Sequence, residues 1–443
     1  MAEGIGIIGA GVAGLHLGLY LQQHGVPSTI YGDKTARQLA EGRMLNTVAH
    51  HNTTVRREQA LGVDHWDLQE YGYFCHHHYI GSPGPGVPPL RFPGEFGAPS
   101  RGIDYRVYLP RLLDDYTGRG GDFRVGNVGP GDLATVAADH ELIVVATGKS
   151  GQPGKPGKQG QSGQSGLAGM FPPRPDKMPY ERPMRRLCGG LYHGIAYSEP
   201  KGVTMSIAPG HGELLEIPMF SADGFVTALL FENIPGGDTE VLADARYDED
   251  PKAFDDLVLT TLRTCHPTVF ERADPATFGL TGPRDLVQGA ITPTVREDWI
   301  RIDGNGSEDG ARYAIAIGDA HTLVDPVIGQ GANAASYEAW ELGTQITEDP
   351  VFDERFCRKA AARRANRVEA TVDWTNLMIG LPPAPHLLEL LGAMSASRPV
   401  ADEFTDNFNY PERQWDILAT PERTRRFLSR HTSAAMERDK DVI

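Results

Sequence analysis

Short apolar runs that end at a glycine recur along this chain, and they predict the buried strands of a parallel sheet. The predicted strands are residues 5–8, 28–31, 142–146 and 313–317. A helix should follow the first strand and end at Gly25, which suits a C-terminal cap. Another helix should begin after Asp104, a good N-cap residue, and run to Tyr116. Alternation of strand and helix predicts an α/β fold.

A different pattern covers residues 185–234, where alternating segments between turn residues predict an antiparallel sheet. Within it, residues 203–208 and 213–218 should form a hairpin around the turn at 209–212. Residues 81–99 are rich in glycine and proline, which predicts a surface excursion. Further helices are expected over residues 251–264, 354–373 and 386–394.

Glycine occupies every third position from residue 151 to residue 166. The period matches that of collagen, but so few triplets in a globular chain cannot sustain a triple helix. We expect this segment to be a flexible loop without chemistry.

The first of two glycine-rich elements, Gly9-Ala10-Gly11-Val12-Ala13-Gly14, follows the first predicted strand directly. With this spacing, the first glycine permits a tight turn, the second lets a pyrophosphate approach the backbone, and the third lets the helix pack closely. We expect a dinucleotide to bind here at the helix N-terminus, and a turn used only for packing is the alternative. The residues concerned are Gly9, Ala10, Gly11, Ala13 and Gly14.

The usual acidic residue for the ribose hydroxyls is absent at the end of the second predicted strand, where Gly32 stands. Asp33 follows one position later. Either Asp33 binds the ribose from a shifted position, or the adenosine end is held loosely.

The second glycine-rich element begins with Ile317-Gly318-Asp319-Ala320, and a turn at 326–333 leads into a helix expected to begin near Ala332. The N-terminus of such a helix favours negative charge, which reduced flavin carries near N1 and O2. A glycine-rich loop with a surface aspartate is the alternative. Two such elements together indicate one large ligand held at both ends, and FAD fits. The expected contacts are Thr147, Gly148, Asp319, Pro326, Gly329, Gln330, Gly331, Ala332 and Asn333.

Composition narrows the class of protein. The formal net charge of -16 argues against nucleic acid or an anionic membrane as the main partner. The four cysteines are scattered, which favours reduced thiols in a cytosol over disulfides or a zinc site. His76 and His78 could share a strand face, but no third ligand is spaced with them, so we expect no metal. The first apolar stretch lacks the basic start of a signal peptide, and no run is long enough to span a bilayer, so a cytoplasmic protein is expected.

By these features the chain resembles the FAD-dependent aromatic monooxygenases with the fold of para-hydroxybenzoate hydroxylase. Longer strings resemble, more closely, the epoxidase component of the two-component styrene and indole monooxygenases. These strings are residues 43–50, 98–101, 209–213, 325–333 and 401–416. The resemblance implies a Rossmann-type FAD-binding domain, an antiparallel substrate domain and C-terminal helices. We place the FAD domain at 1–45, 101–184 and 290–345, the substrate domain at 46–100 and 185–289, and the helical region at 346–443.

The resemblance also implies site residues. Asn46, His50 and His76 would be catalytic, and Arg43 and Arg101 would contact the cofactor. The styrene-type pocket pattern is completed by Val48, Tyr73 and Ser100, which favours vinyl arenes over indole.

Strand geometry bears on these assignments. If residues 46–50 are extended, Asn46, Val48 and His50 face one side and form a pocket wall. Strict alternation would put Tyr73 and His76 on opposite faces, so both can point inward only if a bulge or a strand start lies between them.

The implied reaction is epoxidation of a styrene-like vinyl arene by a C4a-hydroperoxyflavin formed from FADH2 and O2. A separate NADH-dependent flavin reductase would supply the FADH2, since the chain has no second glycine-rich fingerprint for a nicotinamide. Rival hypotheses are an indole or sulfide monooxygenase of the same family, a self-sufficient NAD(P)H hydroxylase, and a flavin-binding regulatory protein. A homodimer and a monomer both remain open.

Overall fold

The computed structural model describes residues 4–148, 166–302 and 311–440. Its first sheet has six strands in the order β14-β15-β6-β1-β2-β5, parallel except for β14 at one edge. The strands are β1 (Ile5–Ile8), β2 (Ser28–Gly32), β5 (Asp122–Val125), β6 (Leu142–Val145), β14 (Trp299–Ile302) and β15 (Arg312–Ala316). The four predicted parallel strands are therefore confirmed.

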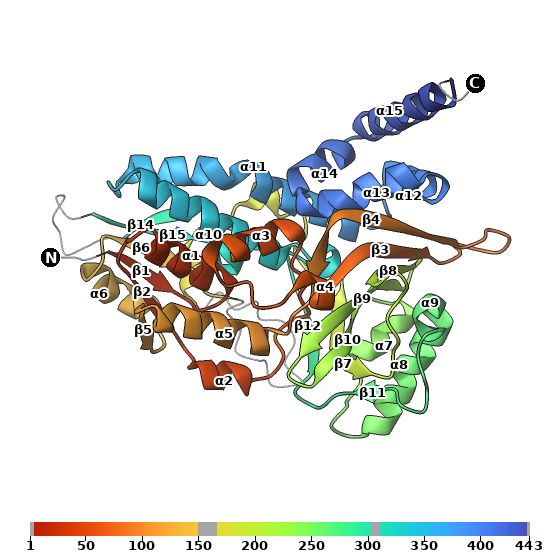
Figure 1. The fold of residues 1–443 in the computed structure, drawn as a ribbon, viewed down its shortest axis with the longest axis horizontal. Helices are drawn as coiled ribbons and strands as arrows, with labels where there is room; N and C mark the ends of the chain where they lie inside the picture. The colour runs from red at the N-terminus through yellow and green to blue at the C-terminus, as the bar shows by residue number, and fades with distance from the viewer. Residues whose placement is uncertain (1–3, 149–165, 303–310, 441–443) are drawn as a thin grey trace.

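Helices flank this sheet, as Figure 1 shows for α5 below it and for α10 and α11 above it. They are α1 (Val12–Gln23), α5 (Tyr105–Gly118), α10 (Gly331–Glu348) and α11 (Glu354–Ile379), with the shorter α2 (Ala36–Ala40), α3 (Asn52–Leu61) and α6 (Leu133–Ala138). Asp104 caps α5 as predicted, since its side chain accepts from the Arg106 amide at 2.9 Å. Apolar side chains of α1, α5 and α10 pack with those of β1 in one core cluster. This core holds the helix N-termini close to the carboxyl ends of the strands.

The second sheet has eight strands and lies beside the first (Figure 1). Its strands are β3 (Gly72–Ile80), β4 (Leu90–Arg101), β7 (Arg186–His193), β8 (Gly202–Ala208), β9 (Gly212–Ser221), β10 (Gly224–Asn233), β11 (Gly279–Leu280) and β12 (Leu286–Ala290). The predicted hairpin is β8–β9. The expected surface excursion over 81–99 is wrong beyond residue 89, because residues 90–101 pair with β3. Pairing is antiparallel except between β3 and β8.

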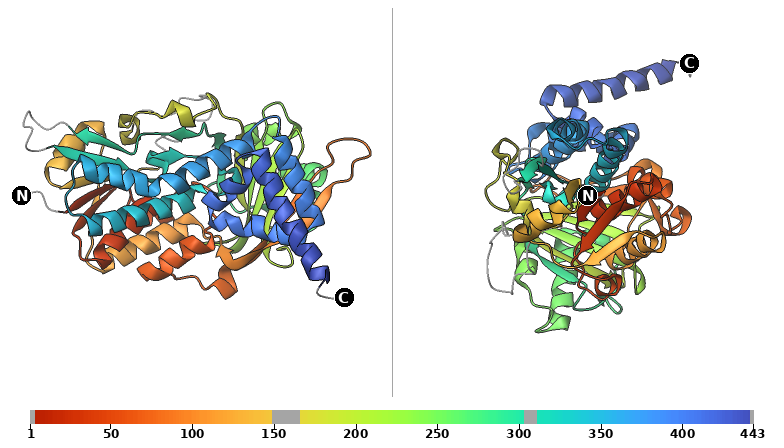
Figure 2. Two further views of the ribbon diagram at one scale, coloured as in Figure 1. Left: turned by 90° about the horizontal axis from the view of Figure 1, so that it is seen from above. Right: turned by 90° about the vertical axis from the view of Figure 1, so that its left-hand side faces the viewer.

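A C-terminal layer of helices packs against β4 and α11. It consists of α12 (Pro385–Ala396), α13 (Arg398–Asp406), α14 (Pro411–Leu418) and α15 (Pro421–Lys440), and α15 projects from the body (Figure 2). The remaining short elements are α4 (Leu68–Tyr71), α7 (Val241–Asp244), α8 (Pro251–Cys265), α9 (Pro267–Phe270), β13 (Thr294–Val295) and β16 (Thr322–Leu323). The predicted α/β class with a second sheet and C-terminal helices is confirmed, while the domain boundaries stay a prediction.

Within the described ranges, none of the helices combines the length and the apolar character needed to cross a membrane. The glycine-repeat prediction for 151–166 falls almost wholly on residues outside the described ones.

Candidate functional site

The first glycine turn is built as a close approach of backbone to backbone. Gly9 has φ +121°, and a Cβ there would lie 2.3 Å from the Ala146 carbonyl oxygen. A Cβ on Gly14 would lie 1.9 Å from the Gly9 oxygen, so helix and strand touch at this point. A Cβ on Gly11 would meet nothing within 4 Å. Packing alone explains Gly9 and Gly14 but leaves Gly11 unexplained, whereas a bound pyrophosphate accounts for all three.

The carboxyl ends of β1, β6 and β15 meet at one edge of the six-stranded sheet, because these strands are parallel and adjacent. Thr147 follows β6, and its buried Oγ1 has no protein partner among the described residues. Asp319 follows β15 on the half-buried turn η6 (Gly318–Ala320). The predicted contacts of the two glycine elements therefore share one edge, which is where α/β sheets bind ligands.

Packing explains why no acid stands at the end of β2. A Cβ on Gly32 would lie 2.8 Å from the Phe123 ring, so a larger residue there would require this ring to shift. Asp33 is exposed, with a carboxylate oxygen 3.6 Å from the Lys34 ammonium. Its contact with a ribose stays a prediction.

The second glycine turn is held by Asn333, near the start of α10. Its Oδ1 accepts from the His51 amide at 2.9 Å and from the Thr54 hydroxyl at 2.7 Å. Its Nδ2 donates to the carbonyls of Ala49 and Gly329, both at 3.0 Å. The side chain of Asn333 thus ties the segment before α3 to the turn that was predicted to hold the flavin ring.

A narrow cavity lies between this turn and the eight-stranded sheet. Pro326, Ile328 and Gly329 line it from the turn, and Tyr73 and His76 line it from β3. The rest of the wall is mainly apolar and includes Val203, Leu215, Ile217, Leu230 and Phe408. Tyr73 and His76 both face inward because the register of β3 shifts between Tyr73 and Cys75, so the predicted bulge is present.

The pocket wall expected from Asn46, Val48 and His50 differs from the structure. Residues 44–49 form no strand, and the cavity is lined by Thr47, Ala49 and His51 instead. Val48 packs in the core beside the six-stranded sheet. Asn46 is half-buried, and its Oδ1 has no protein partner in the described chain.

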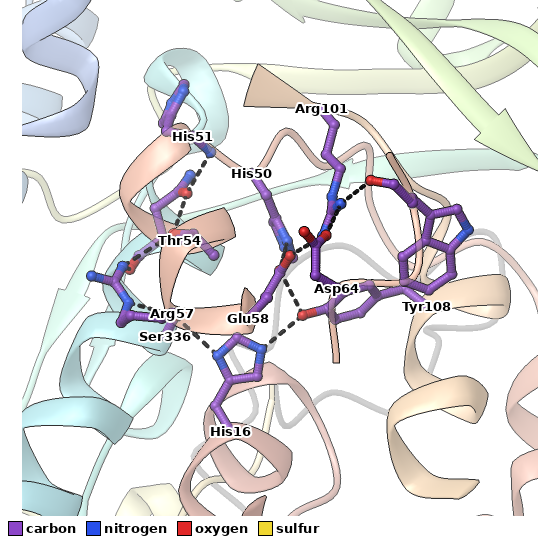
Figure 3. A network of polar contacts seen from close by, with 12 residues as sticks. His16, His50, His51, Thr54, Arg57, Glu58, Asp64, Arg101, Tyr108 and Ser336 are labelled. Carbon is purple, nitrogen blue, oxygen red and sulfur yellow. Dashed lines mark hydrogen bonds and ion pairs between the residues drawn. The ribbon is translucent and has the colours of Figure 1, made fainter. Parts of the chain in front are cut away.

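His50 belongs to a buried polar network, shown in Figure 3. Its Nδ1 lies 2.6 Å from Glu58 Oε1, which also accepts from the Tyr108 hydroxyl at 2.7 Å. Arg101 is fully buried, donates to Glu58, Asp64 and the Trp66 carbonyl, and therefore has its nitrogens Nη1 and Nη2 engaged with protein. This placement disfavours the predicted cofactor contact of Arg101.

The network extends to α1 and α10. His16 lies 2.7 Å from the Tyr108 hydroxyl and 3.0 Å from Ser336 Oγ, to which Arg57 also donates (Figure 3). Burial would raise the pKa of Glu58, but the charges of His50 and Arg101 outweigh it and lower that pKa to about 2.

Glu58 was not predicted. One sequence feature could have indicated it: Glu58 lies between Val55 and Leu61 on the apolar face of α3. A carboxylate in such a position is buried and requires a buried partner of opposite charge.

Two further predicted residues lie outside the cavity lining. Arg43 is exposed and donates to the carbonyls of Pro283 and Leu286. Ser100 is buried opposite Tyr73 on the neighbouring strand, and its side chain interacts with the Tyr73 hydroxyl.

The cavity histidines are neutral. Burial lowers the pKa of His51 to about 3 and that of His76 well below its ordinary value, and neighbouring histidines lower both further. Among the described residues, no three or more His, Cys, Asp or Glu side chains gather as a possible metal site. The cavity lining is thus uncharged and mainly apolar, and with a volume of about 20 Å³ the cavity must widen before an arene can enter.

Comparison with known proteins places these features in context. Residues 163–272 match the family model described as "Styrene monooxygenase A putative substrate binding domain". The chain is 45% identical over 426 residues to styrene monooxygenase StyA of Pseudomonas fluorescens, covering 96% of this chain and 97% of that protein. It has the same identity and coverage with StyA of a Pseudomonas sp.. These matches confirm the family resemblance found in the sequence.

Solved structures agree on the fold. The flavin-dependent brominase Bmp2 aligns with a TM-score of 0.59 at 14% identity, covering 90% of this chain and 94% of that one. The p-nitrophenol 4-monooxygenase PnpA of Pseudomonas putida DLL-E4 aligns with a TM-score of 0.59 at 11% identity, covering 93% and 98%. At such low identity these similarities concern the fold alone.

Proposed function

Because the chain belongs to the styrene monooxygenase family, we propose that it epoxidises the vinyl group of styrene-like arenes. The observation that carries this proposal is the uncharged, mainly apolar cavity between the second glycine turn and the eight-stranded sheet. Overall, a vinyl arene, O2 and FADH2 give the epoxide, FAD and water, so one oxygen atom enters the product and the other leaves as water.

FAD fits the residues at the sheet edge. The open space at Gly11 and the N-terminus of α1 suit the pyrophosphate, and the unpartnered hydroxyl of Thr147 offers a hydrogen bond nearby. Asp319 would bind the ribitol, and the turn from Pro326 to Gly331 would hold the ring. When bound, reduced FAD supplies the electrons that activate O2.

The chain's own residues prepare the site for this reaction. The apolar side chains of β8, β9 and β10 exclude water from the cavity and bind the arene ring. The neutral rings of His51 and His76 bring hydrogen-bonding atoms to the wall without a charge that would attract water. The Asn333 bonds fix this wall relative to the turn, which sets the distance between alkene and flavin.

The reduced cofactor would come from a separate NADH-dependent flavin reductase in the cytoplasm. Supporting this, the sequence contains one nucleotide fingerprint at its start and no second one for a nicotinamide.

The test uses the purified chain with chemically reduced FAD, O2 and styrene, and measures styrene oxide by chiral chromatography. Gly11→Ala should fold normally, because its Cβ meets nothing, yet bind FAD about tenfold or more weakly because the methyl group enters the pyrophosphate site. Gly118→Ala, also in open space but at the end of α5 that precedes the amino end of β5, is the matched control.

Absence of epoxide from the wild type would refute the proposal. A strong preference for indole would reject the substrate class, and turnover of NADH without a reductase would reject the two-component scheme.

A further inference from the structure

His51 is a cavity residue outside the pocket pattern that the family resemblance implied. It stands immediately before α3, and its backbone amide donates to Asn333 Oδ1. The ring lines the cavity together with Tyr73 and His76. The hydrogen bond to Asn333 therefore fixes the backbone from which this ring projects.

Both ring nitrogens of His51 are buried, and neither has a hydrogen-bond partner among the described residues. The faces and edges of the ring are covered by aromatic neighbours, with centroids 6.1 Å from Phe96 and 5.7 Å from Phe408. Because burial keeps the ring neutral, it carries one N–H donor and one acceptor. A buried donor without a partner is costly, so a native fold that retains one indicates a ligand that completes it.

The nearby polar atoms do not supply that partner. His76 Nδ1 and the Thr47 hydroxyl are also buried and without partners in this part of the chain, and the Tyr73 hydroxyl interacts with Ser100 on the neighbouring strand. Together with His51 they give the cavity lining several hydrogen-bonding atoms beside the apolar side chains of β9 and β10. A ligand with an apolar ring and one oxygen atom matches this distribution.

We propose that His51 donates a hydrogen bond to the oxygen atom of the epoxide as it forms in the cavity. This inference rests on the proposed function. The alkene substrate offers no acceptor, so the bond exists only after oxygen has reached the substrate. Such an interaction stabilises the late stages of the reaction without holding the substrate more tightly.

The experiment compares two ligands of nearly equal shape, styrene oxide and cyclopropylbenzene, which carries CH2 in place of the epoxide oxygen. Dissociation constants are measured by calorimetry with the full chain saturated with FAD. His51→Phe should lower the ratio of affinities, oxide over hydrocarbon, by about threefold to tenfold relative to wild type. His51→Asn, which retains a donor, should restore part of the ratio.

The control is His77→Phe on β3, because the His77 ring bonds the Pro200 carbonyl and lies outside the cavity lining. It should leave the ratio unchanged. A second measurement does not depend on the stability of His51→Phe: in the wild type, the ring nitrogen signals of His51 in ¹⁵N NMR should shift with styrene oxide and stay in place with cyclopropylbenzene.

An unchanged ratio in His51→Phe, or equal shifts with both ligands, would overturn the inference while leaving epoxidation intact. Failure of the wild type to bind either ligand would instead refute the proposed function.

Discussion

Replacing Glu58 by glutamine should destabilise the protein by about 3–5 kcal/mol, the usual cost of breaking a buried ion pair. Glu58 is fully buried and accepts from His50, Tyr108 and Arg101. A glutamine retains the shape, but its amide group would face another donor, and Arg101 would keep only Asp64 as an ionic partner.

The pKa of Glu58 gives a second estimate of how much this network stabilises the folded protein. The pKa of Glu58 falls from 4.5 to about 2 on folding, and at about 1.4 kcal/mol per pKa unit this corresponds to about 3 kcal/mol. Because the folded-state pKa is the lower one, this stability is present above pH 4.5 and is lost as the pH falls toward 2.

Urea unfolding followed by tryptophan fluorescence at pH 7 and pH 4 checks both figures. The matched control is Glu41→Gln, which breaks the exposed Glu41–Arg37 pair and should change stability by less than about 0.5 kcal/mol. Below pH 4.5, Glu58→Gln should lose stability less steeply than wild type. A loss below about 1 kcal/mol at pH 7 would refute the view that Glu58 is the buried acceptor that holds this network together.

Two further predictions concern the turn beside the cavity. Asn333→Ala removes hydrogen bonds to His51, Thr54, Ala49 and Gly329. It should lower the free energy of unfolding in urea by about 2–4 kcal/mol, and it should also lower the epoxide yield per FADH2. Asn333→Asp keeps the acceptor and should lower the free energy of unfolding less. Burial and the charge of Glu213 raise the pKa of Asp325 to about 6, against the hydrogen bonds from the Val327 amide and Glu232 and the charge of Arg185, which lower it. Ionisation of Asp325 therefore destabilises the fold as the pH rises from about 4 to neutrality. Asp325→Asn should therefore match wild type in Tm near pH 4 and exceed it at pH 8, and a lower Tm at pH 8 would contradict this.

Local patterns were sufficient to predict most of the fold. The strand at Ile5–Ile8 and the turn behind it are determined by neighbours in sequence, as is the N-cap at Asp104. The error at residues 90–99 has a different origin. Prolines and glycines there predict a loop, yet Gly94 is needed because a Cβ would lie 2.1 Å from the Thr405 hydroxyl of α13. Gly94 and Thr405 lie about 300 residues apart, and a local sequence pattern contains no information on a contact between such distant residues.

The site shows the same limit more sharply, because a shift of one residue reverses which side chains face the cavity. Family resemblance pointed to Asn46, Val48 and His50, and alternation predicted that they share a wall. The segment is not a strand. The two adjacent histidines face different directions, because the His50 ring pairs with Glu58 while the His51 amide donates to Asn333. We therefore expect His50 to act through the network that positions α3, and we propose that His51 is the histidine of the pair that meets the ligand. Substitution of His50 should accordingly change stability and reaction together, and substitution of His51 should change ligand preference with the fold retained.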